Sequence, residues 1–244
     1  VSRDEVRDTE IGGYEVLKEW CEEQRDAFVG KAAGKLDQPK GTLFIGSPGT
    51  GKSAAGRMVA KVFNLPLYML DVSSVMAGVV GESERQMREA LNAVSANREC
   101  VLLLDEIDKA MGGAHRSSGD SGVAKRMLGS LLTWMNDKKE KIFVVMTANN
   151  VHGLPPELMR RGRIDEIFAV NFPCMQERAD IIGIHLRKRG KRLPTPHLER
   201  VALETGKFIG SELEAAVKEG LLTAAVDETE ISADIIIQEA RTIV

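Results

Sequence analysis

The sequence predicts an α/β fold in which a parallel sheet of five strands lies between layers of helices and is followed by a small domain of helices alone. Two observations predict it. Five short runs, apolar at nearly every position, alternate with segments of helical periodicity, and these runs end near residue 173 while helical segments continue. Apolar runs of this length are typical of strands buried on both faces of a parallel sheet. We therefore predict an α/β domain over residues 1–173 and a helical domain over residues 174–244.

The individual elements follow from local patterns. The five predicted strands span residues 42–45, 67–70, 101–104, 142–146 and 167–170. The spacing of apolar residues predicts helices over 53–63 and 84–97 in the first domain, and over 176–188, 197–205, 211–226 and 232–242 in the second. Capping-box patterns predict helix starts at Ser83 and Ser211, because such a box satisfies free N–H groups of the first turn. Ser232 is a suitable N-cap for the last helix.

The composition is that of an ordinary globular protein. The 244 residues are 43% hydrophobic and 28% charged, which suffices for one sizeable core or a core with a small accessory domain. The net charge of -3 gives no general attraction to nucleic acid or anionic membranes. Cys21, Cys100 and Cys174 are far apart and form no CxxC pair, so we predict neither a disulfide framework nor a zinc site. No apolar run of membrane-spanning length and no signal peptide are found, so we expect a cytoplasmic location.

A segment suited to phosphate binding lies between the first predicted strand and the first predicted helix. Residues 46–53 read GSPGTGKS and match the pattern GxxxxGKS. Glycines let backbone N–H groups surround phosphate oxygens without side-chain clashes, and the following helix adds its positive dipole end. In this pattern Lys52 reaches the β- and γ-phosphates, and the hydroxyl of Ser53 binds Mg²⁺. The expected phosphate-binding residues are Ser47, Pro48, Gly49, Thr50, Gly51, Lys52, Ser53 and Ala54.

Two carboxylates follow the third predicted strand. Asp105 and Glu106 end the run CVLLLDE, and the carboxyl ends of parallel strands face the crevice in which a nucleotide lies. We expect Asp105 to hold Mg²⁺ through water and Glu106 to polarise the attacking water as general base. A lone acidic pair is commonly an exposed turn, but its position after a phosphate-binding loop favours the catalytic interpretation. For Asp108, tuning of this site and capping of a helix both remain open.

Three arginines gather in the segment LMRRGRID, residues 158–165, namely Arg160, Arg161 and Arg163. An arginine is costly to bury and keeps its charge, so such a cluster needs either water or an anion. From this segment alone a solvated loop is the simpler interpretation. The other motifs change that balance.

The phosphate-binding loop, DEID, VVMTANN and the arginine cluster occur in this order, and together they make the chain resemble the AAA ATPases, P-loop NTPases of the wider AAA+ superfamily. IGGYEVLKEW, VGESERQMREAL, LPPELMRRGRID and FIGSELEAAVKEG match as well, so the similarity covers residues 11 to about 240. GDSGVAKRMLGSLLTWM and LPPELMRRGRIDEIF are similar in particular to the small AAA proteins encoded in cyanobacteria and plastid genomes. The resemblance implies a P-loop NTPase core with a helical lid, and ATP or ADP with Mg²⁺ as ligands.

The resemblance also implies catalytic roles. Asn149, eleven residues before Arg160, would be the polar sensor that orients the attacking water together with Glu106. Arg160 and Arg163 would contact the γ-phosphate on the neighbouring subunit, where a guanidinium supplied in trans stabilises the charge of the transition state. The solvated-loop interpretation of the arginine cluster is then the weaker one.

Residues that would contact the base of the nucleotide follow from the same resemblance. Ile11 and Gly12 would lie beside the adenine, with Gly210 and Ser211 of the helical lid near it. FIGSEL contains no arginine, which agrees with the branch of AAA enzymes that lacks a lid arginine.

One departure from the family concerns the first pore loop. Many relatives carry an aromatic residue just before GES, which grips a threaded polypeptide, whereas this chain reads SSVMAGVVGESE with Val79 and Val80 at that place. A pore-lining role of Met76 and these valines, and ordinary loop packing, both remain open. Because a large planar side chain is missing, the sequence does not predict threading.

From these motifs we expect an Mg²⁺-dependent ATPase that forms a homo-oligomeric ring, a hexamer, and remodels a protein or protein complex. One alternative is an AAA loader or motor that acts on nucleic acid, and another is a nucleotide-switched scaffold with little hydrolysis. The basic run HLRKRGKR, residues 185–192, is best interpreted as a solvated helix end, and no aromatic-studded basic patch accompanies it. All expected catalytic residues are present, which argues against an inactive scaffold. The location would be the plastid stroma if the chain is plastid-encoded.

Overall fold

The structure is a computed structural model that describes residues 1–4, 14–30, 38–72, 75, 82–112, 120–160 and 162–243. These residues form two compact units. The first unit comprises the described residues of 1–46 other than Tyr14, together with 52–169. The second comprises Tyr14, Ser47–Gly51 and 170–243. The functional boundary between residues 173 and 174 stays a prediction.

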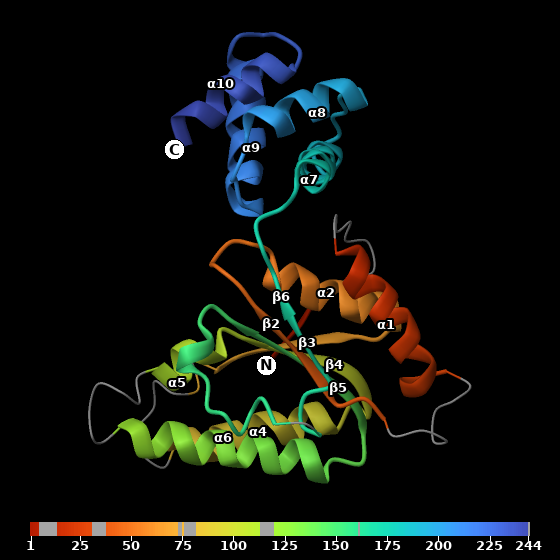
Figure 1. Cartoon of the computed structure of the whole chain (residues 1–244), viewed down its shortest axis with the longest axis vertical. Helices are drawn as coiled ribbons and strands as arrows, with labels where there is room; N and C mark the ends of the chain where they lie inside the picture. The colour runs from red at the N-terminus through yellow and green to blue at the C-terminus, as the bar shows by residue number, and fades with distance from the viewer. Residues whose placement is uncertain are drawn as a thin grey trace. The chain divides into compact units, whose positions relative to one another are not determined.

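The first unit is built on a six-stranded sheet in the order β1-β3-β4-β5-β2-β6 (Figure 1). Five of its strands run parallel and are β2 (Gly41–Ile45), β3 (Leu67–Asp71), β4 (Glu99–Asp105), β5 (Lys141–Ala148) and β6 (Glu166–Ala169). They correspond to the five predicted strands. The α/β class with a parallel central sheet is therefore confirmed.

One edge of the sheet differs from the prediction of five parallel strands. A sixth strand, β1 (Ser2–Asp4), pairs antiparallel to β3, so the sheet is mixed. Its sequence SRD contains no apolar residue and is largely exposed, so an apolar pattern could not reveal it. Its last residue accepts a hydrogen bond of 2.8 Å from the side chain of Arg57.

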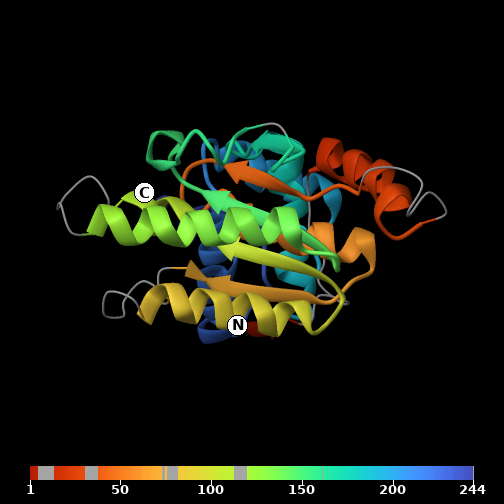
Figure 2. The same cartoon turned by 90° about the horizontal axis from the view of Figure 1, so that it is seen from below.

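Helices cover both faces of the sheet, as Figures 1 and 2 show. The covering helices are α1 (Glu15–Phe28) and α2 (Lys52–Phe63) on one face, and α4 (Glu82–Ser95) and α6 (Asp120–Asp137) on the other. Successive residues of β5 serve the two faces. Phe143 packs its ring against Phe28 and Phe63, whereas Val144 belongs to the apolar cluster that includes Leu91 of α4. Because both faces are covered, the strand is apolar without alternation.

The start of α4 corrects a predicted cap. The helix begins at Glu82, so Ser83 lies inside its first turn rather than at the N-cap. The Ser83 hydroxyl is buried and has no hydrogen-bond partner within the described part of the chain. The capping box predicted at Ser83 is therefore wrong.

Two short elements, α5 (Ile107–Gly112) and the 3-10 helix η2 (Val151–Gly153), follow β4 and β5.

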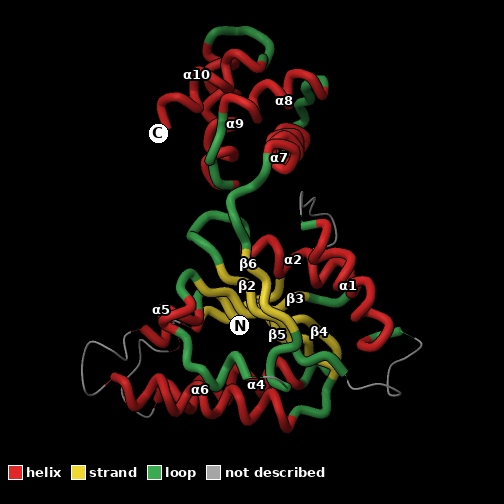
Figure 3. The backbone as a smooth tube through the Cα atoms, viewed as in Figure 1, coloured by secondary structure: helices red, strands yellow, loops and turns green. Residues whose placement is uncertain are grey.

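The second unit contains helices and loops, with no strand among its described residues (Figure 3). Its helices are α7 (Met175–Arg187), α8 (Thr195–Glu204), α9 (Gly210–Val226) and α10 (Ala233–Ile243). Their apolar faces share one core, in which Leu186, Val201, Val217 and Ile236 are fully buried. The predicted all-α character of this part is confirmed.

Two helix starts in the second unit test the predicted caps. α9 begins at Gly210, and Glu212 accepts a hydrogen bond of 2.8 Å from the N–H of Ile209, so the box predicted at Ser211 is wrong. Ser232 caps α10 as predicted, because its hydroxyl accepts from the N–H of Ile235 at 3.3 Å. Across the described parts of both units, no helix has the length and apolar composition needed to cross a membrane.

Candidate functional site

The glycine-rich loop joins the end of β2 to the start of α2, and two of its glycines have conformations that other residues rarely adopt. Gly49 has φ of 79° and Gly51 has φ of 99°. A β-carbon on Gly51 would lie 2.2 Å from the Tyr14 hydroxyl oxygen, and one on Gly49 would lie 2.3 Å from Cδ1 of Ile209. Both conformation and space therefore require glycine at these positions.

Tyr14 was not among the residues predicted from the sequence. Its hydroxyl donates to the carbonyl oxygen of Thr50 at 3.2 Å, so it holds the middle of the glycine-rich loop. Burial, together with the charge of Glu177, raises the pKa of Tyr14 to about 12, so the phenol keeps its proton. Thr50 also closes the loop on itself, because its hydroxyl donates to the carbonyl oxygen of Ser47 at 2.8 Å.

Lys52 begins α2 and is nearly buried, with 6% of its surface exposed. Its Nζ donates to the carbonyl oxygen of Gly46 at 2.8 Å. Burial lowers the pKa of Lys52, and the nearby carboxylates of Asp105, Asp108 and Glu106 act in the opposite direction. The ammonium group is thus held between the end of β2 and the acidic residues that follow β4.

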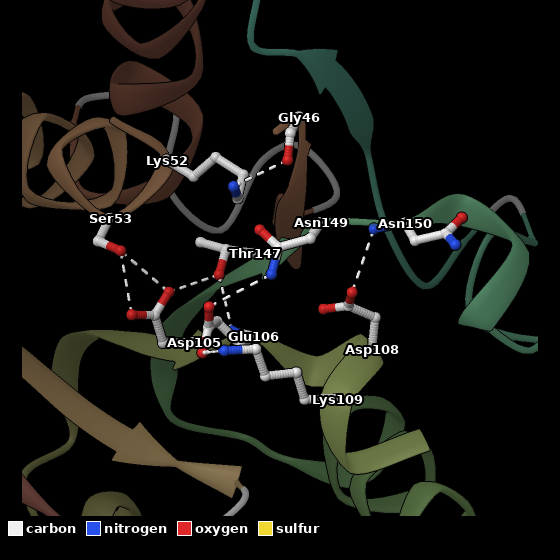
Figure 4. A network of polar contacts seen from close by, with 10 residues as sticks. All are labelled: Gly46, Lys52, Ser53, Asp105, Glu106, Asp108, Lys109, Thr147, Asn149 and Asn150. Carbon is white, nitrogen blue, oxygen red and sulfur yellow. Dashed lines mark hydrogen bonds and ion pairs between the residues drawn. The ribbon is translucent and has the colours of Figure 1, made fainter. Parts of the chain in front are cut away.

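Ser53 and Asp105 meet as the sequence predicted (Figure 4). The Ser53 hydroxyl lies 3.0 Å from each carboxylate oxygen of Asp105. A hydroxyl and a carboxylate are oxygen ligands of the kind that Mg²⁺ prefers, so this pair fits the ion that the family implies. Asp105 accepts a further hydrogen bond from the hydroxyl of Thr147, a residue of β5 that the sequence did not single out.

Glu106 is the first residue after β4 and has φ of 51°, a left-handed conformation that is strained for a side chain of this type. Its carboxylate accepts a hydrogen bond of 3.2 Å from Nδ2 of Asn149 and lies 2.6 Å from Nζ of Lys109. The hydrogen bond from Lys109 is the main reason why the pKa of Glu106 is lowered, with Asn149 acting in the same sense against the effect of burial. Glu106 is therefore ionised and able to accept a proton.

Asn149 retains capacity for another partner. Its Oδ1 is buried and accepts no hydrogen bond from the residues that the structure describes, although Nδ2 is bound to Glu106. A buried acceptor of this kind is costly unless water or a ligand satisfies it. Asn150, the next residue, points its side chain elsewhere and accepts from the N–H of His152 at 2.9 Å.

Asp108 occupies the first turn of α5 and is 8% exposed. Its Oδ2 accepts a hydrogen bond of 3.1 Å from the N–H of Asn150, whereas its Oδ1 has no hydrogen-bond partner among the described residues. The bond connects α5 to the segment that carries Asn149. Of the two roles left open for Asp108, this contact favours tuning of the site.

Arg160 and Arg163 lie apart from the other predicted catalytic residues. Asp165 accepts from the N–H groups of Lys40 and Gly41, and Lys40 Nζ donates to the Gly162 carbonyl oxygen at 2.7 Å. The arginine segment is therefore fastened at the amino end of β2, while Gly46 and Lys52 follow its carboxyl end.

The five residues of β2, at about 3.3 Å each, separate these two ends by about 16 Å. The Arg163 guanidinium donates to the carbonyl oxygen of Glu157 at 2.9 Å, and Arg160 is exposed. The structure thus brings Lys52, Ser53 and the acidic pair together with Asn149, and places the two arginines elsewhere.

The remaining predicted residues concern the base of the nucleotide. Gly210 and Ser211 begin α9, and a β-carbon on Gly49 would lie 2.8 Å from the Ser211 hydroxyl oxygen. Ser211 is therefore next to the glycine-rich loop. Ile11 and Gly12 lie outside the described residues, and so do Arg161, Met76, Val79 and Val80.

Known proteins are similar to this chain over most of its length. The profile of the family described as "ATPase family associated with various cellular activities (AAA)" matches residues 42–172, more than half of the chain. The AAA domain-containing protein ycf46 of Pyropia yezoensis is 42% identical over 227 residues, which are 92% of this chain and 46% of that protein. The protein of the same name from Guillardia theta is 38% identical over 97% of this chain and 47% of its own length.

A relative with a named activity is also similar to this chain. The ATP-dependent zinc metalloprotease FtsH of Thermotoga maritima is 34% identical over 88% of this chain and 36% of its own length. The chain thus spans about half the length of the ycf46 relatives and about a third of FtsH. The predicted resemblance is confirmed, and the matched domain is one that binds and hydrolyses ATP. The chain belongs to the AAA family of ATPases.

Proposed function

We propose that this chain is the Mg²⁺-dependent ATPase module of a homo-oligomeric ring, a hexamer, that couples ATP hydrolysis to the remodelling of a protein or protein complex. The observation that carries the proposal is the convergence of Lys52, Ser53, Asp105, Glu106 and Asn149 beside the glycine-rich loop (Figure 4). This set contains a cation for phosphate oxygens, oxygen ligands for Mg²⁺ and a carboxylate base.

Each group has one task in this proposal. Backbone N–H groups of the glycine-rich loop and Lys52 hold the phosphates of ATP. Ser53 and Asp105 would hold Mg²⁺, and the ion would neutralise charge on the phosphate oxygens. Glu106 accepts the proton of the attacking water, and the unpaired Oδ1 of Asn149 accepts a hydrogen bond from the same water and orients it.

The position of the arginines supports the proposed ring. Arg160 and Arg163 are fastened at the amino end of β2, about 16 Å of strand away from its carboxyl end. They are therefore poorly placed to serve the phosphates of their own subunit. A neighbouring subunit whose phosphate site meets this edge would receive them in trans, where an arginine stabilises the charge on the transferred phosphoryl group.

Two observations favour a protein target over nucleic acid. The FtsH relative is named an ATP-dependent zinc metalloprotease, and a protease acts on proteins. In the basic run at the end of α7, Arg189 forms an ion pair of 3.0 Å with Glu214, which Lys218 also contacts at 3.1 Å. Part of this basic run is thus neutralised inside its own unit and is unavailable to phosphates of DNA or RNA.

A Glu106→Gln variant tests the proposal. It should bind ATP as tightly as the wild type but release no phosphate, because the base is lost while the phosphate contacts remain. Glu99→Gln is the matched control, since Glu99 begins the same strand at its opposite end and is exposed. Phosphate release is measured with and without Mg²⁺, and with protein, DNA or RNA added. Turnover by Glu106→Gln at the wild-type rate would exclude Glu106 as the base, and stimulation by nucleic acid alone would favour the loader.

A further inference from the structure

Thr147 is the one buried polar residue of β5, a strand whose residues are all described. Its hydroxyl makes hydrogen bonds to two consecutive residues, the last residue of β4 and the first residue after it (Figure 4). It donates to Oδ1 of Asp105 and accepts from the backbone N–H of Glu106 at 2.8 Å. A single hydroxyl thus connects the residue proposed to hold Mg²⁺ with the residue proposed as base.

The backbone explains why such a connection is needed. In the β4–β5 ladder the last paired residues are Leu104 and Met146, so the sheet no longer fixes Asp105 and Glu106 from the β5 side. The backbone of Glu106 then adopts φ of 51°, a conformation that persists in a non-glycine residue only where its surroundings hold it. The Thr147 hydroxyl satisfies the Glu106 N–H at this point, where a buried donor without a partner would be costly.

Thr147 itself is held firmly. Its backbone is paired in the ladder with β2, opposite Phe44, and its side chain is fully buried. The hydroxyl has one proton, which goes to Asp105, so its lone pair faces the Glu106 N–H. Neither bond can be made by a valine, although a valine has nearly the same volume.

We infer that Thr147 is a positioning residue of the ATPase site. Its hydroxyl sets the direction of the Asp105 carboxylate toward Mg²⁺ and the direction in which the strained Glu106 peptide presents its carboxylate. The inference rests on the proposed roles of Asp105 and Glu106. The inference distinguishes Thr147 from Asn149, whose hydrogen bond goes to the side chain of Glu106. Loss of Thr147 should weaken both Mg²⁺ binding and turnover, whereas loss of Asn149 should affect turnover alone.

Four variants of the full chain test this assignment. Thr147→Val removes the hydroxyl and keeps the volume, Thr147→Ala also removes the methyl group, and Thr147→Ser keeps the hydroxyl. Thr42→Val is the matched control, because Thr42 is equally buried on the neighbouring strand but donates to the Glu166 carbonyl oxygen at 2.9 Å, outside the site.

Two readouts are compared. One is the Mg²⁺ concentration at which a fluorescent ADP analogue is half bound, and the other is the kcat of phosphate release. In Thr147→Val both should worsen about 10–100-fold, the usual effect of removing a group that orients a metal ligand. Binding of the analogue without Mg²⁺ should not change, Thr147→Ser should recover most of both quantities, and Thr42→Val should alter neither.

Three outcomes would overturn the assignment. They are a Thr147→Val protein with unchanged Mg²⁺ response and kcat, a Thr147→Ser protein as impaired as Thr147→Ala, and a Thr42→Val protein with the same losses. The serine and alanine variants differ only in the hydroxyl, so they decide the question even if the valine variant does not fold. If the wild-type protein itself binds and hydrolyses ATP without any response to Mg²⁺, the proposed function fails independently of Thr147.

Discussion

Mixing two inactive variants tests whether the arginines act on a neighbouring subunit. A subunit with Lys52→Ala lacks the cation for phosphate but still offers its arginine segment. A subunit with Arg160→Ala and Arg163→Ala keeps the phosphate site but has no arginines to offer. Each variant alone should be nearly inactive, because loss of an arginine supplied in trans costs about 10³–10⁵ in rate.

The expected recovery follows from the positions of the phosphate site and the arginine segment, which lie at opposite ends of β2. In a ring of head-to-tail contacts, each site lies between one subunit that binds ATP and one that supplies arginines. In a random equal mixture, half of the sites have an intact Lys52, and half of those face an intact arginine segment. Recovery should therefore reach about one quarter of the wild-type rate per subunit when sites work independently. If the arginines serve their own subunit, no complete site forms and the mixture stays inactive.

The assay is phosphate release at a protein concentration at which native mass spectrometry shows mixed rings. Wild-type rings doped with a subunit that carries both lesions show how many inactive sites a ring tolerates. Arg85→Ala with Arg88→Ala is the control for removal of two exposed arginines, since both pair with glutamates of their own helix. Mixed rings without activity, together with tolerance of doping, would refute action in trans.

Three further predictions concern single positions. Lys52→Ala should abolish tight ATP binding in a fluorescence titration, because the phosphate charge loses its buried cation. Gly51→Ala should weaken nucleotide binding in the same titration, and the loss should be no smaller than the loss of folded protein. The reason is that its β-carbon would lie 2.2 Å from the Tyr14 hydroxyl oxygen. For Glu214, burial acts to raise the pKa, but hydrogen bonds from Lys218 and Arg189 outweigh it, so the pKa is lowered. The stabilisation by Glu214 is therefore present above its unfolded-state pKa and is lost as the pH falls through the lowered folded-state pKa. Glu214→Gln should lower the free energy of unfolding, measured in urea, by up to about 1 kcal/mol at neutral pH. In strong acid it should have no effect.

The sequence predicted the parallel strands because they are buried on both faces, where nearly every residue is apolar. It did not predict β1, whose SRD is polar, nor α6, in which Gly122 and Gly129 interrupt the helical signal. The serine-based caps show a second limit. Ser83 and Ser211 stand one position inside the helices that they were expected to start, and a helix boundary is uncertain by one or two residues when it is inferred from a local pattern.

Within the site, the sequence motifs identified the residues that lie at the carboxyl ends of the parallel strands, since each belongs to a short pattern with its own chemistry. Sequence reasoning missed three residues. Tyr14 and Thr147 matter through contacts with residues distant in sequence. Lys109 matters through a contact with Glu106 in a turn whose geometry no sequence pattern encodes. Tyr14 touches a loop 36 residues away, and Thr147 bonds to residues 41 and 42 positions earlier. Their roles, like those of the motif residues, stay predictions for the variants described above.

The topology of the sheet bears directly on assembly. In parallel strands, residues that follow a strand gather at the carboxyl edge and residues that precede one lie at the amino edge. Gly46 follows β2, Glu106 follows β4 and Asn149 follows β5, and the order β4-β5-β2 makes these strands neighbours. The arginine segment precedes β6, which is parallel to β2, so it must lie at the other edge.

A two-fold interface formed by either edge alone cannot bring the arginine segment of one unit to the phosphate site of the other, because the same patch then meets itself. A head-to-tail contact can, and when it is repeated with rotation it closes into a ring. On this reasoning a dimer joined head to tail has one complete site and one incomplete site, so its rate per subunit should be about half that of the ring. A covalently linked pair that hydrolyses ATP as fast per subunit as the ring would contradict the argument.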